Sequence, residues 1–203
     1  MKNKILCIIP ARCGSKGIKD KNIIDVCGKP LIVYSIEKAL ELKKHQLIDK
    51  VIVSTDCQKI ADVAISYGAD VPFLRPENIS TDTSKSIDFI LHALEFFENI
   101  GEYYDAVLLL QPTSPIRSFE QLQKAINIFA TSESQSLISC YKEEYINDLV
   151  MYKISDKDVL NPLNELHNKG VRRQDHGDVY VRNGSIYLTK TNYLILLRKM
   201  LCE

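Results

Sequence analysis

Residues 5–22 of this 203-residue chain read ILCIIPARCGSKGIKDKN, and this stretch decides the fold. The run from Ile5 to Pro10 is short and continuously apolar, which is typical of a strand buried on both faces of a parallel sheet. The loop that follows, residues 11–22, holds four Lys or Arg side chains and two glycines. In open α/β sheets ligands bind beyond the carboxyl ends of the strands, so we expect this loop to form a ligand site.

Apolar runs and helical patterns alternate along the first two-thirds of the chain. Further buried strands are expected at 50–55, 71–74, 105–111 and 136–141. Between them, helices are expected from apolar stripes at Ile32, Ile36, Ala39 and Leu40; Ile60, Ala61, Ala64 and Ile65; Ile87, Ile90, Leu91, Leu94 and Phe97; Leu122, Ala125, Ile126 and Phe129. A strand at 184–189 and a short helix from Thr191 follow. This order predicts an α/β sandwich, with a mostly parallel sheet and helices on both faces.

Residues 143–179 interrupt this alternation, because they are polar and rich in turn-forming residues. We expect an excursion from the core there. Of the whole chain, 45% of residues are hydrophobic and 26% are charged, which is ordinary globular composition. One domain over residues 1–203 is therefore expected, with 143–179 as a segment within it.

Charge and cysteine content exclude several classes of protein. Lys and Arg number 26 and Asp and Glu also number 26, so no overall field attracts nucleic acid or an anionic membrane. The six cysteines are scattered, without the spacing of a zinc site, and indicate free thiols in a reducing compartment. The N-terminal apolar run is cut short by Pro10 and Arg12, so we expect neither a signal peptide nor a membrane span. A cytoplasmic protein without a metal cluster is the expectation.

The loop after the first strand has the chemistry of a phosphate site. Small residues let backbone N–H groups approach an anion, and Arg and Lys donate charge-assisted hydrogen bonds to phosphate oxygens. A triphosphate is the natural ligand. The loop matches neither the G-x-x-x-x-G-K-[ST] pattern of ATPases nor the G-x-G-x-x-G pattern of dehydrogenases. The alternative interpretation is a solvated basic turn.

Separated motifs in the same order resemble the N-acylneuraminate cytidylyltransferases, also called CMP-sialic acid synthetases. The matching segments are I-x-A-R-x-x-S-K-G-x-x-x-K-N at 9–22, V-S-T-D at 53–56, L-R-P at 74–76, a Ser- and Thr-rich helix start at 80–86, L-L-Q-P-T-S-P-x-R at 109–117, R-Q at 173–174 and N-G-x-I-Y at 183–187. The resemblance runs from about Ile5 to Tyr193. It implies a three-layer α/β/α sandwich of the nucleotide-diphospho-sugar transferase type, with a Rossmann-like sheet and a protruding dimerisation arm.

The resemblance also implies a reaction and a set of site residues. CMP from CTP would be joined to the anomeric hydroxyl of a sialic acid-type nonulosonic acid, with release of pyrophosphate. The implied phosphate-binding residues are Arg12, Ser15, Lys16, Lys21 and Asn22, of which Arg12 and Lys21 are the catalytic candidates. Arg75, Ser84 and Ser86 would surround the cytidine, and Gln111, Arg173 and Tyr187 would bind the sugar acid. Taken singly, each of these residues also has a structural interpretation, such as a helix cap or a core ring.

The chain departs from the family pattern after the N-G-x-I-Y strand. Family members continue into an acidic D-x-D element that binds Mg²⁺, and no D-x-D follows Tyr187 here. Mg²⁺ is the cofactor that the resemblance implies, and its loss would lower the rate of phosphoryl transfer. One alternative is therefore a shortened nucleotide- or sugar-binding homologue without turnover, and another is a nucleotidyltransferase for a different base. The resemblance also implies a homodimer formed through residues 143–179.

Overall fold

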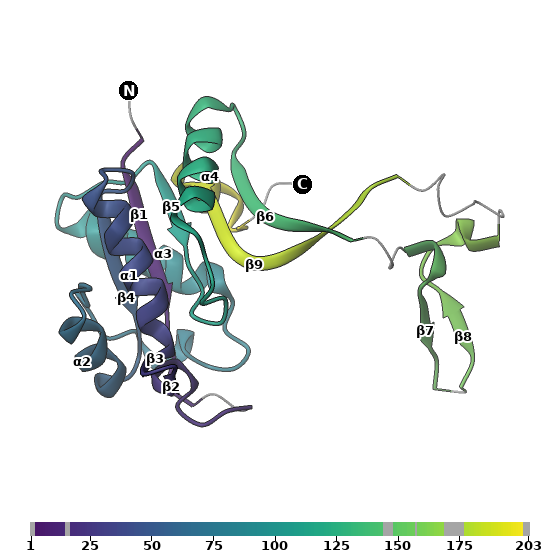
Figure 1. The fold of residues 1–203 in the computed structure, drawn as a ribbon, viewed down its shortest axis with the longest axis horizontal. Coiled ribbons are helices and arrows are strands. Elements are labelled where there is room, and N and C mark those ends of the chain that lie inside the picture. Colours follow the sequence, from purple (N-terminus) through teal and green to yellow (C-terminus); the bar gives the residue numbers. More distant parts are fainter. Residues whose placement is uncertain (1–2, 15–16, 144–147, 157, 169–176, 201–203) are drawn as a thin grey trace. The chain divides into compact units, whose positions relative to one another are not determined.

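The computed structural model describes residues 3–14, 17–143, 148–156, 158–168 and 177–200 (Figure 1). The chain divides into two compact units. Unit 1 comprises residues 1–139 and 184–203, and unit 2 comprises residues 140–183. The pocket described below lies wholly within unit 1.

A five-stranded sheet in the order β4-β1-β5-β9-β6 forms the centre of the fold. Its strands are β1 (Ile5–Pro10), β4 (Lys50–Ser54), β5 (Ala106–Leu109), β6 (Ser136–Glu143) and β9 (Val179–Lys190). β1 pairs in parallel with both β4 and β5, so that Cys7 lies between Val51 and Leu108. β5 pairs antiparallel with β9. The predicted mixed, mostly parallel sheet is thus confirmed, with the apolar run at 5–10 inside it.

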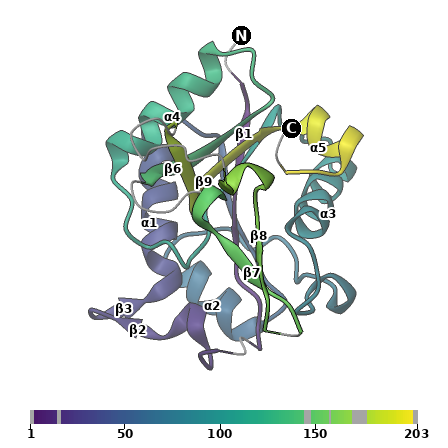
Figure 2. The same cartoon turned by 90° about the vertical axis from the view of Figure 1, so that its right-hand side faces the viewer.

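Alternate residues of the strands point into two separate hydrophobic cores, one on each face of the sheet. Cys7 and Ile9 of β1 belong to the core beneath α1 (Leu31–Lys44), α2 (Gln58–Ser66) and α4 (Phe119–Thr131). Leu6 and Ile8 belong to the core beneath α3 (Ser86–Asn99) and α5 (Thr191–Leu197). Figure 2 shows α1 and α4 on one side of the sheet and α3 and α5 on the other. The predicted α/β sandwich is therefore confirmed. Strands that are buried on both faces need helices on both faces of the sheet, as observed here.

The strand expected at 71–74 is wrong. Only isolated parallel bridges occur there, joining Ile52 to Asp70 and Thr55 to Leu74. Pro72 lies between these bridges and has no N–H to donate, so a continuous hydrogen-bonded ladder cannot pass through it. The segment still lies along the edge of β4, and its backbone leads directly to Arg75.

Unit 2 contains regular structure that the sequence pattern did not reveal. A two-stranded antiparallel hairpin of β7 (Tyr152–Ile154) and β8 (Leu160–Pro162) is flanked by the short helices η3 (Asp148–Val150) and η4 (Glu165–Asn168). The hydroxyl of Tyr152 lies 3.3 Å from Nδ1 of His167, which ties the hairpin to η4. Strands of three residues are too short to show a period of two in the sequence.

Shorter elements lie near the carboxyl ends of the central strands. They are η1 (Lys21–Ile23), β2 (Asp25–Val26), β3 (Lys29–Pro30) and η2 (Glu77–Ile79). Among the residues that the structure describes, no helix combines the length and apolar character needed to cross a membrane.

Candidate active site

A pocket of about 560 Å³ lies where β1 and β5 end. Its wall comes from three segments: the loop after β1, the segment that leads into α3, and the loop after β5. It brings together most of the residues that the sequence singled out, namely Arg12, Lys21, Asn22, Arg75, Ser84, Ser86 and Gln111. The expectation that ligand-binding groups gather beyond the carboxyl ends of the strands thus agrees with the position of this pocket.

The loop after β1 is held in place by backbone and side-chain hydrogen bonds. Nδ2 of the buried Asn22 donates to the carbonyl oxygen of Arg12 at 3.1 Å. The next amide, that of Cys13, donates to Oδ1 of Asp56 at 2.7 Å. Asn22 therefore fixes the backbone under Arg12, a role that differs from direct contact with phosphate. Ser15 and Lys16, also expected in this loop, lie outside the described residues.

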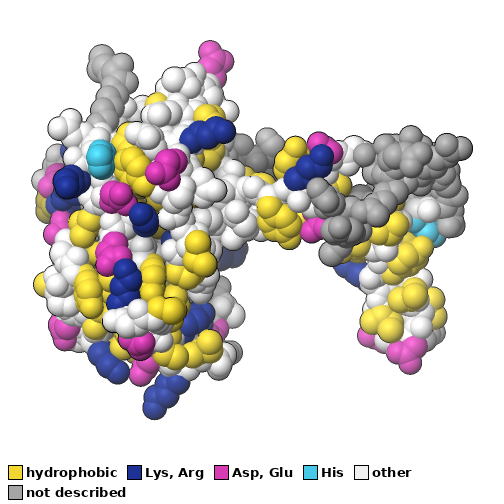
Figure 3. All heavy atoms as spheres, viewed as in Figure 1, with side chains coloured by type: hydrophobic (Ala, Val, Ile, Leu, Met, Phe, Trp, Pro, Cys, Tyr) yellow, Lys and Arg dark blue, Asp and Glu magenta, His cyan; other side chains and the backbone are white. Residues whose placement is uncertain are grey.

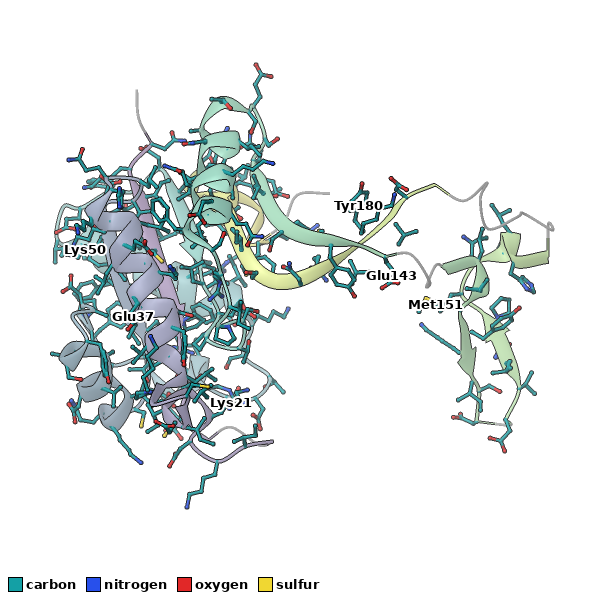
Figure 4. The ribbon with its side chains drawn as sticks, viewed as in Figure 1. Lys21, Glu37, Lys50, Glu143, Met151 and Tyr180 are labelled. Atoms are coloured by element: carbon teal, nitrogen blue, oxygen red, sulfur yellow. The ribbon has the colours of Figure 1, made fainter. Side chains whose placement is uncertain are left out.

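Two cations of the loop after β1, Arg12 and Lys21, line the pocket, and they differ in whether a carboxylate pairs with them. The guanidinium of Arg12 forms an ion pair with Asp82, and each of these side chains is about one-third exposed. Lys21 begins η1 and lies at the end of unit 1 where α1 starts (Figure 4). Within the described part of the chain, the ion pairs do not include Lys21. Its ammonium group is thus available to an anion.

Arg75 is a buried cation that is anchored to the end of β4. Its Nε donates to Oγ of Ser54 at 3.1 Å, its Nη2 donates to the carbonyl oxygen of the same residue, and its guanidinium lies 4.7 Å from the ring centre of Phe89. Burial lowers the pKa of Arg75 to about 10, partly offset by the nearby Asp56 carboxylate. Arg75 remains charged at neutral pH and adds fixed positive charge to the pocket wall.

A cluster of hydroxyl groups forms the rim between η2 and α3. The amide of Thr81 donates to Oγ of Ser84 at 2.9 Å, and the hydroxyl oxygens of these two residues lie 2.8 Å apart. The turn is closed at the start of α3 by Asp88, whose Oδ2 accepts from the amide of Lys85 at 3.0 Å. Local hydrogen bonds thus hold this rim, and Ser84 and Ser86 present polar groups to the pocket.

Gln111 is positioned by the buried Arg117. Nη2 of Arg117 donates to the carbonyl oxygen of Gln111 at 2.6 Å, and Nε donates to the carbonyl oxygen of Ser185 at 2.8 Å. Nη1 donates to Oγ of Ser35 at 3.0 Å, so one guanidinium joins the loop after β5 to β9 and α1. Burial lowers the pKa of Arg117 to about 10, which leaves it charged at neutral pH.

Gly184 lies directly beside the side chain of Gln111. A Cβ atom at Gly184 would sit 3.6 Å from Oε1 of Gln111, and the glycine has φ +73°, a left-handed conformation. A glycine is therefore favoured at this point of the N-G-x-I-Y motif by the left-handed backbone conformation, whereas 3.6 Å is an ordinary contact distance for a Cβ atom.

Of the residues expected at the sugar acid, Tyr187 is not among the pocket residues. Tyr187 lies on β9 opposite Leu109, half-buried, and packs against the core beneath α3. Arg173 lies outside the described residues. Sequence reasoning also missed Asp82, Thr81 and Thr113, which line the pocket. The Ser- and Thr-rich segment at 80–86 was the available signal for Asp82 and Thr81, but only Ser84 and Ser86 of that segment were assigned.

Comparisons with known proteins extend over nearly the whole chain. The model of a family described as Cytidylyltransferase matches residues 6–202. Similar curated proteins include "Pseudaminic acid cytidylyltransferase" of Campylobacter jejuni, 38% identical over 92% of this chain and 78% of that protein. "CMP-N,N'-diacetyllegionaminic acid synthase" of Legionella pneumophila is 36% identical over 95% of this chain and 80% of that protein. "N-acylneuraminate cytidylyltransferase" of Escherichia coli is 34% identical over 93% of this chain and 44% of that protein.

A solved structure supports the fold at lower sequence identity. It is a CMP:2-keto-3-deoxy-manno-octonic acid synthetase in complex with CTP, and it superposes with a TM-score of 0.67. The match covers 98% of this chain and 79% of that chain at 17% identity. At this identity the similarity concerns the fold alone.

Proposed function

This chain belongs to the cytidylyltransferase family, and from that premise we propose that it transfers CMP from CTP to a nonulosonic acid and releases pyrophosphate. The resemblance inferred from the motifs is confirmed by the family match and by relatives at 34–38% identity. Three of those relatives are named for pseudaminic, legionaminic and N-acylneuraminic acids. The acceptor of this chain is therefore proposed as a sugar acid of that class.

The pocket beyond β1 and β5 is the observation that carries the proposal. Among the described residues, Arg12, Lys21 and Arg75 give its wall three positive charges against the one carboxylate of Asp82, while the protein as a whole has a formal net charge of zero. A local excess of positive charge in a neutral protein attracts a polyanion to one place. A volume of about 560 Å³ falls within the range of small-ligand sites. These features fit a nucleoside triphosphate.

The proposed reaction is an in-line displacement at the α-phosphorus of CTP. The anomeric hydroxyl oxygen of the sugar acid attacks and loses its proton to solvent, a new P–O bond forms, and the bond to the bridging oxygen of the β-phosphate breaks. Arg12 and Lys21 would neutralise the charge that develops on the phosphoryl oxygens and on the departing pyrophosphate. Such catalysis consists of positioning and electrostatic stabilisation more than of covalent chemistry.

The remaining pocket residues divide into a nucleotide side and an acceptor side in this proposal. Arg75, Ser84 and Ser86 would contact the cytidine and its ribose, and Asn22 supports the loop beneath the phosphates. Gln111 lines the pocket, its carbonyl oxygen accepts from the buried Arg117, and it is assigned to the sugar acid on the family motif. Ser15 and Lys16 are assigned to the phosphates, and Arg173 and Tyr187 to the sugar acid, on the family motifs alone.

Mg²⁺ is proposed to enter with CTP. Among the described residues, no three His, Cys, Asp or Glu side chains are placed to hold a metal ion. Asp82, the carboxylate in the pocket wall, is engaged by Arg12. The described residues therefore do not fit a metal site of their own, and no ligand or reaction step is assigned to the ion. Turnover measured with and without EDTA tests the requirement.

Unit 2 is the proposed dimerisation element. Its hairpin exposes large apolar side chains, among them Ile154 at 67% and Leu160 at 62%, which pair with each other across β7 and β8. Figure 3 shows hydrophobic side chains on the surface of this unit. An isolated two-stranded hairpin is marginally stable in water, and exposed apolar surface of this kind marks protein interfaces. A second copy of the chain would cover it. We place the dimer in the cytoplasm, which accords with the free thiols of Cys7, Cys13 and Cys27.

The activity can be tested by pyrophosphate release from the purified chain. CTP, Mg²⁺ and one of pseudaminic, legionaminic or N-acetylneuraminic acid are combined, and each component is omitted in turn. Release that requires CTP and at least one of these acids is expected. If all three acids leave pyrophosphate at background while CTP binds, the chain is a nucleotide-binding homologue without turnover and the proposal is wrong.

A further inference from the structure

The carboxylate of Asp82 has the wrong sign for a site that binds phosphates. It lines the pocket between the hydroxyl-bearing residues Thr81 and Thr83, and it forms an ion pair with Arg12. A carboxylate at a few ångströms from a triphosphate repels it. The presence of Asp82 therefore requires an explanation beyond substrate binding.

We propose that Asp82 is a positioning residue that competes with the phosphates for Arg12, and that it thereby limits the affinity for CTP and speeds the release of pyrophosphate. The inference rests on the proposed function for the assignment of Arg12 to the phosphates. Asp82 acts through Arg12 and does not contact the reacting atoms.

The exposure of the two side chains makes such an exchange possible. Arg12 and Asp82 are 32% and 33% exposed, so the guanidinium can leave the carboxylate without exposing a buried, unpaired charge. Their backbones are held separately: Asn22 fixes the loop of Arg12, and the Thr81–Ser84 hydrogen bonds fix the turn that carries Asp82. A rotation of side chains is then sufficient to switch partners.

The other two pocket cations are arranged differently. Arg75 is 6% exposed and bound to Ser54, so it cannot exchange partners when a nucleotide arrives. Within the described residues, the ion pairs join neither Arg75 nor Lys21 to a carboxylate. Among the described pocket residues, Arg12 is thus the cation for which an internal anion competes directly.

This arrangement has a consequence for the catalytic cycle. When CTP binds, Arg12 turns from Asp82 to the phosphates, and Asp82 faces the bound anion. After the α–β bond has broken, pyrophosphate is held by the same cations, and Asp82 reclaims Arg12 as the anion departs. A site with cations alone would hold pyrophosphate more tightly and would release it more slowly.

The test is the binding of CTP and of inorganic pyrophosphate to Asp82→Asn by calorimetry. Asparagine keeps the size of the side chain and removes its charge, so both dissociation constants should fall by roughly threefold to tenfold. Cytidine, which has no phosphate, should bind as in the parent. Asp20→Asn is the matched control, because Asp20 lies in the loop after β1 but pairs with the exposed Lys59 outside the pocket. Its dissociation constants should stay within about twofold of the parent.

A second arm separates this role from a general effect on folding. In an Arg12→Ala background, Asp82→Asn should gain less affinity for pyrophosphate than it gains in the parent, because the part of its effect that acts through Arg12 is absent and only direct repulsion of the anion remains. Steady-state turnover should show stronger product inhibition by pyrophosphate in Asp82→Asn. A purely structural role would leave that inhibition constant unchanged.

The outcomes distinguish this inference from the proposed function. If Asp82→Asn binds CTP and pyrophosphate no more tightly than the parent does, the proposed competition for Arg12 is overturned. The proposed function is not affected by that result as long as the parent binds CTP. If the parent does not bind CTP but Asp82→Asn binds pyrophosphate more tightly than the parent does, the proposed function is wrong and the proposed competition for Arg12 is supported. If the parent and the variant bind neither anion, both are overturned.

Discussion

Replacing Arg117 by Met is expected to disturb the architecture of the pocket, because its guanidinium joins three separate segments of the chain. Arg117 is 5% exposed and donates to the carbonyl oxygens of Gln111 and Ser185 and to the hydroxyl of Ser35. Methionine fills much of the same volume but donates no hydrogen bond. The half-buried carbonyl oxygens of Gln111 and Ser185 and the buried hydroxyl of Ser35 then lose a charged donor, at about 1.5 kcal/mol each. The gain from removing a buried charge offsets part of this loss.

A net decrease of roughly 3 kcal/mol in the free energy of unfolding is expected for Arg117→Met. Urea unfolding followed by circular dichroism gives the value, and Arg198→Met, at the end of α5, is a control that should change it by less than about 0.5 kcal/mol. The KM for the sugar acid should rise more than the KM for CTP, because Gln111 loses its support. A variant as stable as the parent, with both KM values unchanged, would refute the reasoning.

Three further predictions concern other parts of the molecule. Burial raises the pKa of Cys7 to about 12, so the folded state retains a proton that the unfolded state loses above about pH 9. The free energy of unfolding, measured by urea titration, should therefore fall as the pH rises from 9 toward 11. It should fall less steeply in Cys7→Ala. Gly184→Ala should lower the free energy of unfolding by about 1 kcal/mol in the same assay, since φ +73° is unfavourable for alanine. Ile154→Asp should convert a dimer into a monomer in light scattering, and an unchanged mass would exclude the β7–β8 hairpin from the interface.

The strands of the central sheet could be predicted where a run of apolar residues was uninterrupted in the sequence. The run at 5–10 has an apolar residue at each position from 5 to 9, and these side chains divide between the two cores as a strand buried on both faces requires. The segment at 71–74 is also apolar, but Pro72 interrupts its hydrogen bonding, so apolar character alone was misleading there. The hairpin of unit 2 was not predicted, because three-residue strands carry too little pattern.

Those site residues could be predicted that belong to one continuous sequence motif. Arg12, Lys21 and Asn22 could be assigned because one loop contains them, whereas the ion pair of Arg12 with Asp82 joins residues 70 positions apart. The support of Gln111 by Arg117 likewise depends on Ser185 and Ser35, which come from other elements. Contacts of this kind arise from the tertiary fold and leave no local signal in the chain.

The proposed function requires that the pocket beyond β1 binds a nucleoside triphosphate through Lys21 and its neighbours. It is tested most directly by the dissociation constant of CTP for Lys21→Ala and Lys19→Ala, measured by calorimetry at one salt concentration. Lys21 lines the pocket, while Lys19 is exposed in the same loop and does not line it. The loss of a charged hydrogen bond of about 1.5–3 kcal/mol should weaken CTP binding by roughly 10- to 150-fold in Lys21→Ala. Lys19→Ala should stay within about threefold of the parent, and equal effects of the two substitutions, or none, would contradict the account.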